Sequence, residues 1–191
     1  TNGWQLDSAD GLRLETQTRN SVTNSGAIYH TDTRLVRQGA GASVAQSTRT
    51  MQQRTNRFDL LEETSGTGAN TLTNRYVHND DGTIAQTFRP DGSWELFIYD
   101  DRLRATSIFS AYLNEPLSSN AANCRLTIHD YSTNVVNIGE FSGDDGSIRP
   151  GSPRKTIEFI KNQPVAQSFH VHKLGERRDI VCLSTNAEWT N

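Results

Sequence analysis

The feature that most constrains this chain is an alternation of apolar and polar residues with a period of two. It runs through residues 12–16 (LRLET), 84–88 (IAQTF), 94–99 (WELFIY) and 157–160 (IEFI). Successive side chains of a strand point to opposite faces, so this alternation is typical of half-buried antiparallel strands. An amphipathic helix would instead repeat its apolar residues about every three to four positions, and no segment has such a stripe.

Turn signals separate the alternating segments. An Asp-Gly dipeptide between alternating runs favours a tight hairpin turn, because the central residues of such a turn need positive φ angles. We therefore expect an all-β fold, an antiparallel curved sheet of consecutive β-hairpins with little or no helix, in a single β-rich domain over residues 1–191. The dipeptide occurs at Asp10-Gly11, Asp81-Gly82, Asp91-Gly92 and Asp145-Gly146.

The composition argues against several classes of protein. Apolar residues make up 34% of the 191 residues and the net charge is −3, which argues against nucleic acid as the main partner. No apolar stretch approaches the ~18 residues of a membrane-spanning helix, so we expect no membrane span. The chain lacks an initiator Met and an N-terminal signal segment, and its content of apolar residues is low for a protein that must close its own core. We therefore expect it to be a piece of a longer protein.

A repeat lies near the middle of the chain. Residues 75–92 (RYVHNDDGTIAQTFRPDG) and 96–107 (LFIYDDRLRATS) superpose with an offset of 21, which places Tyr76 on Phe97. Each segment has an aromatic or histidine pair spaced by two residues, then an acid or amide, a turn and a second strand-like run. Side chains spaced by two share a face of a strand, and Asp or Asn favours the start of a turn. Each segment is therefore expected to form one hairpin.

This repeat resembles the RHS/YD-repeat family, the tyrosine-aspartate repeats. The clearest resemblance covers residues 75–107, with weaker units on either side. His78 stands where the family has Tyr, and Leu103 replaces the turn glycine of the second unit, so we expect that turn to differ in type or length. The residues that match the family pattern are Arg75, Tyr76, Asn79, Asp81, Gly82, Pro90, Asp91, Gly92, Tyr99, Asp100 and Arg104.

The resemblance implies a function as well as a fold. Hairpin units of this family build the wall of a hollow shell, which in bacterial polymorphic toxins encloses a toxic C-terminal segment, and other members lie at the cell surface. It implies that the chain is a non-enzymatic structural or interaction segment of a secreted or cell-surface bacterial protein. The implied partners are the remaining parts of a larger RHS-type chain or an encapsulated C-terminal segment, and no cofactor is expected.

Two other functions remain open on the sequence. A carbohydrate-binding β-sheet module would stack a glycan partner on exposed aromatic rings. The candidates are Trp4, Trp94 and Trp189, although the alternation of Trp94 with Leu96 favours core packing. A glycoside-active enzyme would need two carboxyl groups about 5–10 Å apart in one cleft. The acidic pairs lie at predicted turns, where they are expected to bond their own backbone, so no catalytic residue is assigned.

The remaining polar residues favour structural roles. Of the 19 basic residues 16 are Arg, which we expect to form cross-strand pairs with carboxylates rather than a ligand site. His170 and His172 share a strand face, but no third ligand is identifiable, so no metal site is assigned. Cys124 and Cys182 form either one disulfide or two separate thiols, and separate thiols are favoured.

Overall fold

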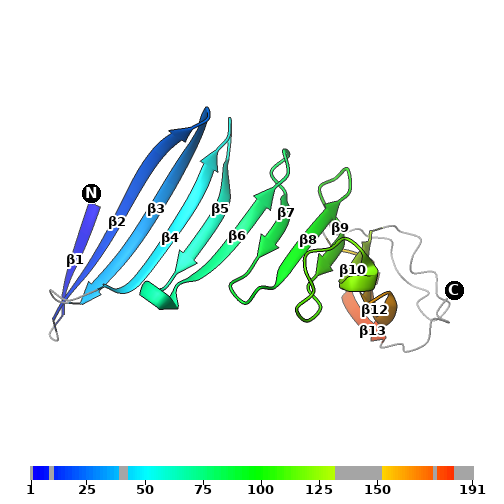
Figure 1. The fold of residues 1–191 in the computed structure, drawn as a ribbon. Coiled ribbons are helices and arrows are strands. Elements are labelled where there is room, and N and C mark those ends of the chain that lie inside the picture. The colour runs from blue at the N-terminus through cyan, green and yellow to red at the C-terminus, as the bar shows by residue number, and fades with distance from the viewer. Residues whose placement is uncertain (1, 9–10, 39–42, 132–151, 174–175, 183–191) are drawn as a thin grey trace. The chain divides into compact units, whose positions relative to one another are not determined.

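The structure is a computed structural model, and the chain divides into two compact units, Thr1–Gly92 and Ser93–Asn191. Each unit is a succession of antiparallel strands (Figure 1). The structure describes residues 2–8, 11–38, 43–131, 152–173 and 176–182, and it describes the side chains of residues 15–38, 43–131 and 152–169.

The first unit holds seven strands in its described residues. Each strand pairs with its neighbours along the chain, and three β-bulges interrupt the pairing, at Val36/Arg37, Thr50/Met51 and Val77/His78. Bulges increase the local twist of a sheet and bend it. The elements are β1 (Asn2–Ser8), β2 (Gly11–Asn24), β3 (Ala27–Gln38), β4 (Ser43–Gln53), β5 (Phe58–Ser65), the 3₁₀ turn η1 (Gly68–Asn70), β6 (Leu72–His78) and β7 (Ile84–Phe88).

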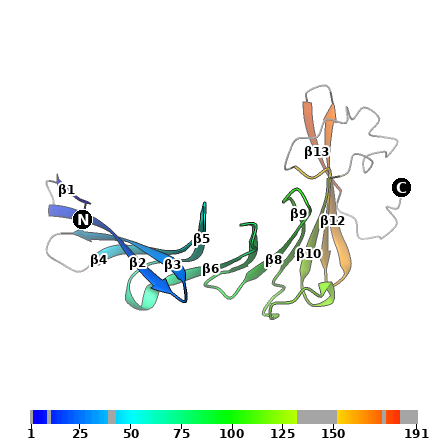
Figure 2. The ribbon, with the colours of Figure 1, turned by 90° about the horizontal axis from the view of Figure 1, so that it is seen from above.

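The second unit repeats this plan with six strands in its described residues. Figure 2 gives a view of its strands from above, as one layer in which each strand lies beside the next. Bulges fall at Ile98/Tyr99 and Glu158/Phe159. The elements are β8 (Trp94–Tyr99), β9 (Ala105–Ser110), the 3₁₀ turn η2 (Ala121–Asn123), β10 (Arg125–Asp130), β11 (Lys155–Ile160), β12 (Gln163–Lys173) and β13 (Glu176–Cys182).

The expected fold class is confirmed. The described elements are antiparallel strands in consecutive order, so the fold is all-β, and the helical content among them is limited to the two short 3₁₀ turns. Asp81-Gly82 and Asp91-Gly92 lie in turns, where Gly82 has a φ of 96° and Gly92 a φ of 82°. The turns predicted at Asp10-Gly11 and Asp145-Gly146 include residues outside the described ones.

The buried apolar core is small and lies mostly in the second unit. In the first unit most described strand side chains are half-buried or exposed, because the strands form a single layer. The apolar side chains of these strands are therefore only partly shielded from solvent, which agrees with the low apolar content of the chain. The buried apolar side chains among the described residues are Val36, Trp94, Phe109, Cys124 and Phe169.

Candidate functional site

The repeat predicted from the sequence recurs in three dimensions. The hairpin β6–β7 and the hairpin β8–β9 have the same register and the same bulge, displaced by the 21-residue offset. The segments 75–92 and 96–107 are thus two copies of one supersecondary unit. In the first hairpin the opposed pairs are Arg75/Phe88, Val77/Gln86 and, after the bulge, His78/Ile84, and in the second they are Leu96/Phe109, Ile98/Ser107 and, after the bulge, Tyr99/Ala105.

The turns of the two hairpins are also alike, so the expectation that the second turn differs was wrong. In the first turn Asn79 N donates to Thr83 O at 2.9 Å, and Gly82 N donates to Asn79 O at 3.0 Å. The second turn has the same two bonds, from Asp100 N to Arg104 O and from Leu103 N to Asp100 O, each at 3.0 Å. Leu103 takes the place of glycine by adopting a left-handed backbone with a φ of 59°.

A side-chain bond closes each turn at equivalent positions. Asn79 Nδ2 donates to Thr83 Oγ1 at 2.9 Å, whereas Arg104 Nε donates to Asp100 Oδ2 at 2.8 Å. Asp100 Oδ1 also accepts from the backbone N–H of Arg104 at 2.9 Å. The hydrogen bond from the Arg104 side chain and those from backbone N–H groups hold the pKa of Asp100 below its usual range.

A histidine of the first repeat hairpin and a tyrosine that follows β10 tie the two hairpins to neighbouring strands. His78 Nε2 lies 2.8 Å from the carbonyl oxygen of Leu60 on β5, and its Nδ1 lies 3.3 Å from Gly82 O. In the second unit Tyr131 donates its hydroxyl to Ala105 O at 2.9 Å, and the guanidinium of Arg104 lies 4.3 Å from the Tyr131 ring centroid. His78 therefore occupies the aromatic position of the repeat as a hydrogen-bonding structural residue.

A buried carboxylate anchors the first repeat hairpin to the strand before it. Asp59 is 2% exposed and accepts from Arg57 Nε at 2.7 Å and from Arg54 Nε at 2.9 Å. Burial acts to raise the pKa of Asp59, but the two guanidinium bonds outweigh it and the pKa lies below its usual range. Arg57 also donates to Asp80 O at 2.8 Å. Any residue larger than glycine at position 82 would place its Cβ only 2.7 Å from Arg57 Nε. The turn glycine thus makes room for this arginine.

The other signature residues have local structural roles. Asp81 Oδ1 accepts from both the N–H and the hydroxyl of Thr83, and these bonds lower the pKa of Asp81. Arg75 Nε donates to Glu62 Oε2 at 3.0 Å on an exposed part of β6. Pro90, Asp91 and Gly92 form the turn after β7, which Gly92 N closes with a 3.0 Å bond to Arg89 O.

A charged ladder covers one face of β2 to β5, as the abundance of arginine predicted. Arg19 donates to both oxygens of Asp32 at 2.6 and 2.7 Å, and Arg34 donates to both oxygens of Glu15 at 2.7 and 3.0 Å. Arg49 pairs with Glu63 at 2.7 Å.

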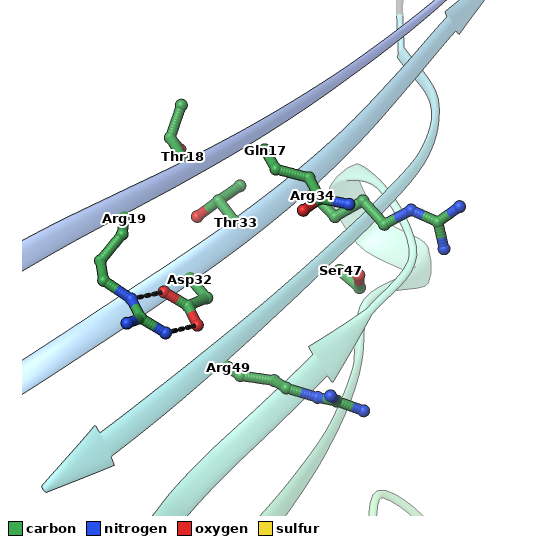
Figure 3. Close-up of a pocket in the computed structure, with 8 residues that line it drawn as sticks. All are labelled: Gln17, Thr18, Arg19, Asp32, Thr33, Arg34, Ser47 and Arg49. Carbon is green, nitrogen blue, oxygen red and sulfur yellow. Dashed lines mark hydrogen bonds and ion pairs between the residues drawn. The ribbon is translucent and has the colours of Figure 1, made fainter. Parts of the chain in front are cut away.

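An open depression of about 720 Å³ lies over this ladder (Figure 3), and it is lined by Gln17, Thr18, Arg19, Asp32, Thr33, Arg34, Ser47 and Arg49.

The charged side chains around this depression neutralise one another, because each of its three arginines pairs with a carboxylate. Hydrogen bonds from Arg19 hold the pKa of Asp32 below its usual range, and the Asp32 carboxylate raises the pKa of Arg19. The Glu15 carboxylate likewise raises the pKa of Arg34. The Asp32 carboxylate, held ionised in this way, is unsuited to act as a general acid, which needs a raised pKa. The ladder therefore supports cross-strand cohesion.

The sequence reasoning missed a row of polar side chains across β2, β3 and β4. His30 Nδ1 lies 2.8 Å from Ser21 Oγ, and His30 Nε2 lies 2.8 Å from Gln53 Oε1. Because the Gln53 oxygen only accepts, Nε2 donates this bond, and in the neutral ring Nδ1 then accepts from the Ser21 hydroxyl. The ring also packs edge-on against Phe58, with centroids 5.3 Å apart. The row depends on the register of three strands, which alternation alone does not reveal.

Of the three candidate stacking residues, only Trp94 has a side chain that the structure describes. Trp94 is 3% exposed and donates Nε1 to Glu115 O at 2.9 Å, so its ring packs in the core and offers no face to a ligand. The side chains of Trp4 and Trp189 lie outside the described ones, as do those of His170 and His172.

The thiol of Cys124 is free and fully buried, and burial raises its pKa. It donates to Asn120 O at 3.3 Å, so it acts as a small packed side chain near η2. The side chain of Cys182 lies outside the described ones.

No family model matches the chain, and no curated protein matches it. No three His, Cys, Asp or Glu side chains gather into a metal-binding group among the residues that the structure describes. Within the same part of the chain, no helix has the length and apolar character needed to cross a membrane.

Proposed function

We propose that this chain is a non-enzymatic wall segment of a larger RHS-type shell or surface protein, secreted by a bacterium. The observation that carries the proposal is the recurrence of one hairpin unit with the same register, bulge and turn bonds at an offset of 21 residues. Repeats of this kind extend a sheet by adding identical units, each of which is completed by its neighbours.

The way the strands are stabilised supports a wall. In the first unit the described strands are held by backbone ladders, by arginine–carboxylate pairs and by bonds such as that of His78 to Leu60 O, with little apolar burial. A sheet stabilised within its own plane leaves both faces available. One face of such a wall would meet an enclosed segment and the other the surroundings.

Two other functions have less support. The hypothesis of a carbohydrate-binding module loses one of its three candidate stacking residues, because the ring of Trp94 is buried. A glycoside-active enzyme needs a carboxyl group with a raised pKa, whereas the described carboxyl groups whose pKa clearly departs from its ordinary value, Asp32, Asp59, Asp81 and Asp100, all have a lowered pKa.

The test is to express the whole reading frame from which the chain derives and to image the product by electron microscopy. The proposal expects a hollow particle with walls of β-hairpins, in which these residues form part of the wall. It also expects a segment of the same chain to resist protease until the particle is opened. A filled, compact product with no enclosed segment and with these residues in a separate domain would contradict it.

A further inference from the structure

A serine hydroxyl and a histidine ring are hydrogen-bonded to each other on one face of the first unit. Ser21 on β2 lies directly opposite His30 on β3, and Ser21 Oγ lies 2.8 Å from His30 Nδ1. Side chains of a strand project from the faces of its sheet, and Ser21 is exposed, so a small molecule can reach the hydroxyl from solvent. A hydroxyl bonded to an imidazole is the usual arrangement of an activated oxygen nucleophile.

The ring of His30 is oriented from its other side. His30 Nε2 donates to Gln53 Oε1 on β4 at 2.8 Å, so in the neutral ring Nδ1 keeps the lone pair that can accept the Ser21 proton. Phe58 on β5 packs edge-on against the ring, with the centroids 5.3 Å apart. Ser21, His30 and Gln53 are therefore arranged as a nucleophile, a base and an acceptor that orients the base.

We propose that Ser21 is an acyl-acceptor site that takes an acyl group from an activated carboxylic ester, with His30 as the general base. Ser21 Oγ attacks the ester carbonyl and forms a new C–O bond, while its proton passes to His30 Nδ1. The C–O bond to the leaving group then breaks, and the leaving oxygen takes the proton from His30. The products are an O-acyl serine and a free alcohol or phenol, with His30 neutral again, so the step balances without an oxidant or a cofactor.

The surroundings of the row favour a single modification over repeated turnover. Rapid acyl transfer needs hydrogen-bond donors aimed at the oxyanion of the tetrahedral intermediate. The neighbouring cross-strand pair supplies Arg19, but Arg19 already donates from Nε and Nη2 to the Asp32 carboxylate (Figure 3). We therefore expect slow acylation and still slower hydrolysis, so that the acyl group stays on Ser21. Such a site is compatible with a non-enzymatic wall and does not depend on that function.

The first experiment treats the whole 191-residue chain with 4-nitrophenyl acetate at neutral pH and follows acetylation of individual residues by peptide mass spectrometry. Ser21 should be labelled much faster than Ser25, an exposed hydroxyl in the turn after β2 that donates to Asn24 Oδ1 instead of a base. His30→Gln removes the base and should slow the labelling of Ser21 by about 100-fold, while the rate at Ser25 stays the same.

The second experiment tests the orienting role of Gln53. Gln53→Glu replaces the amide oxygen by a carboxylate, which stabilises the imidazolium that forms during attack, so the labelling of Ser21 should become several-fold faster. Gln53→Met is the matched variant, because it keeps the length of the side chain but loses the amide oxygen, and it should slow the labelling. A role of Gln53 in holding the strands together would not produce the gain with glutamate.

Three results would overturn the proposal. They are labelling of Ser21 no faster than that of Ser25 in the wild-type chain, unchanged labelling of Ser21 in a folded His30→Gln chain, and no gain in the Gln53→Glu chain. Circular dichroism shows whether each variant is folded. If His30→Gln does not fold, the comparison of the two serines in the wild type and the pair of Gln53 variants still decide.

Discussion

Leu103 illustrates how the geometry of a hairpin overrides the preference of one residue. The second repeat turn keeps the bonds of the first although it has leucine where the first has Gly82. A left-handed backbone brings the Cβ of an L-residue close to the following carbonyl oxygen, at a cost of about 1–2 kcal/mol. The bulge, the Asp100–Arg104 bond and the adjoining strands hold Leu103 in that conformation.

Leu103→Gly should therefore stabilise the second unit. The leucine side chain is 53% exposed, so its removal loses little burial, and the relief of backbone strain should raise the free energy of unfolding by about 1 kcal/mol. Chemical denaturation measures the change. Leu103→Ala is the matched control, because it shortens the side chain but keeps the Cβ, and it should bring no gain. A loss of stability in the glycine variant would contradict this account.

At the scale of elements, the Asp59 cluster joins β5 to the first repeat hairpin. Arg57 bonds the Asp59 carboxylate and the carbonyl of Asp80 at once, so a turn is held by a side chain that precedes it by 23 residues. The cluster stabilises the first hairpin only if the carboxylate stays ionised and both arginines remain paired with it.

Asp59→Asn should lower the free energy of unfolding of the first unit by about 2 kcal/mol. The change removes a charge that two arginines bond and leaves an amide in a buried position, where lost charged hydrogen bonds are costly. Urea denaturation together with amide hydrogen exchange at β5 and β6 measures the effect. Glu63→Gln breaks the exposed pair with Arg49 and should cost less than about 1 kcal/mol. Equal effects of the two substitutions would argue against a special role for Asp59.

The elements were more predictable than their contacts. Alternation predicted the strands over residues 12–16, 84–88, 94–99 and 157–160, and the Asp-Gly dipeptides predicted the turns at residues 81–82 and 91–92, because both signals are local. The 21-residue offset predicted the matching hairpins, although the turn at Leu103 was expected to differ. The Ser21–His30–Gln53 row and the Arg57–Asp80 bond depend on which residues of distant strands oppose each other. One residue of register shift would move these side chains to opposite faces, and composition and spacing do not settle that shift.

At the scale of the whole molecule, aspartates held ionised are spread over both units. The pKa values of Asp32, Asp59, Asp81 and Asp100 all lie below the ordinary value. A carboxyl group whose pKa is lower in the folded state contributes stability above the unfolded pKa, about 3.9, and that contribution is lost as pH falls through the folded pKa.

The thermal midpoint should consequently show no acid-induced loss from these groups above about pH 5, and it should fall steadily from about pH 4 downward. Calorimetry across a pH series, at constant ionic strength, measures this dependence. Asp59→Asn should show a shallower fall than the wild type, because one of the linked groups no longer titrates. A midpoint that rises on acidification would contradict the assignment.

The strictly consecutive order of strands within each unit has a consequence for how the chain folds. Each described strand pairs with the strands immediately before and after it, so most steps of assembly close a short loop and cost little chain entropy, the longest connection being residues 131–154 between β10 and β11. Folding can begin at any hairpin and spread outward one strand at a time, without waiting for a distant segment. A chain of this kind can acquire structure while it is still being synthesised, in the order in which its residues emerge.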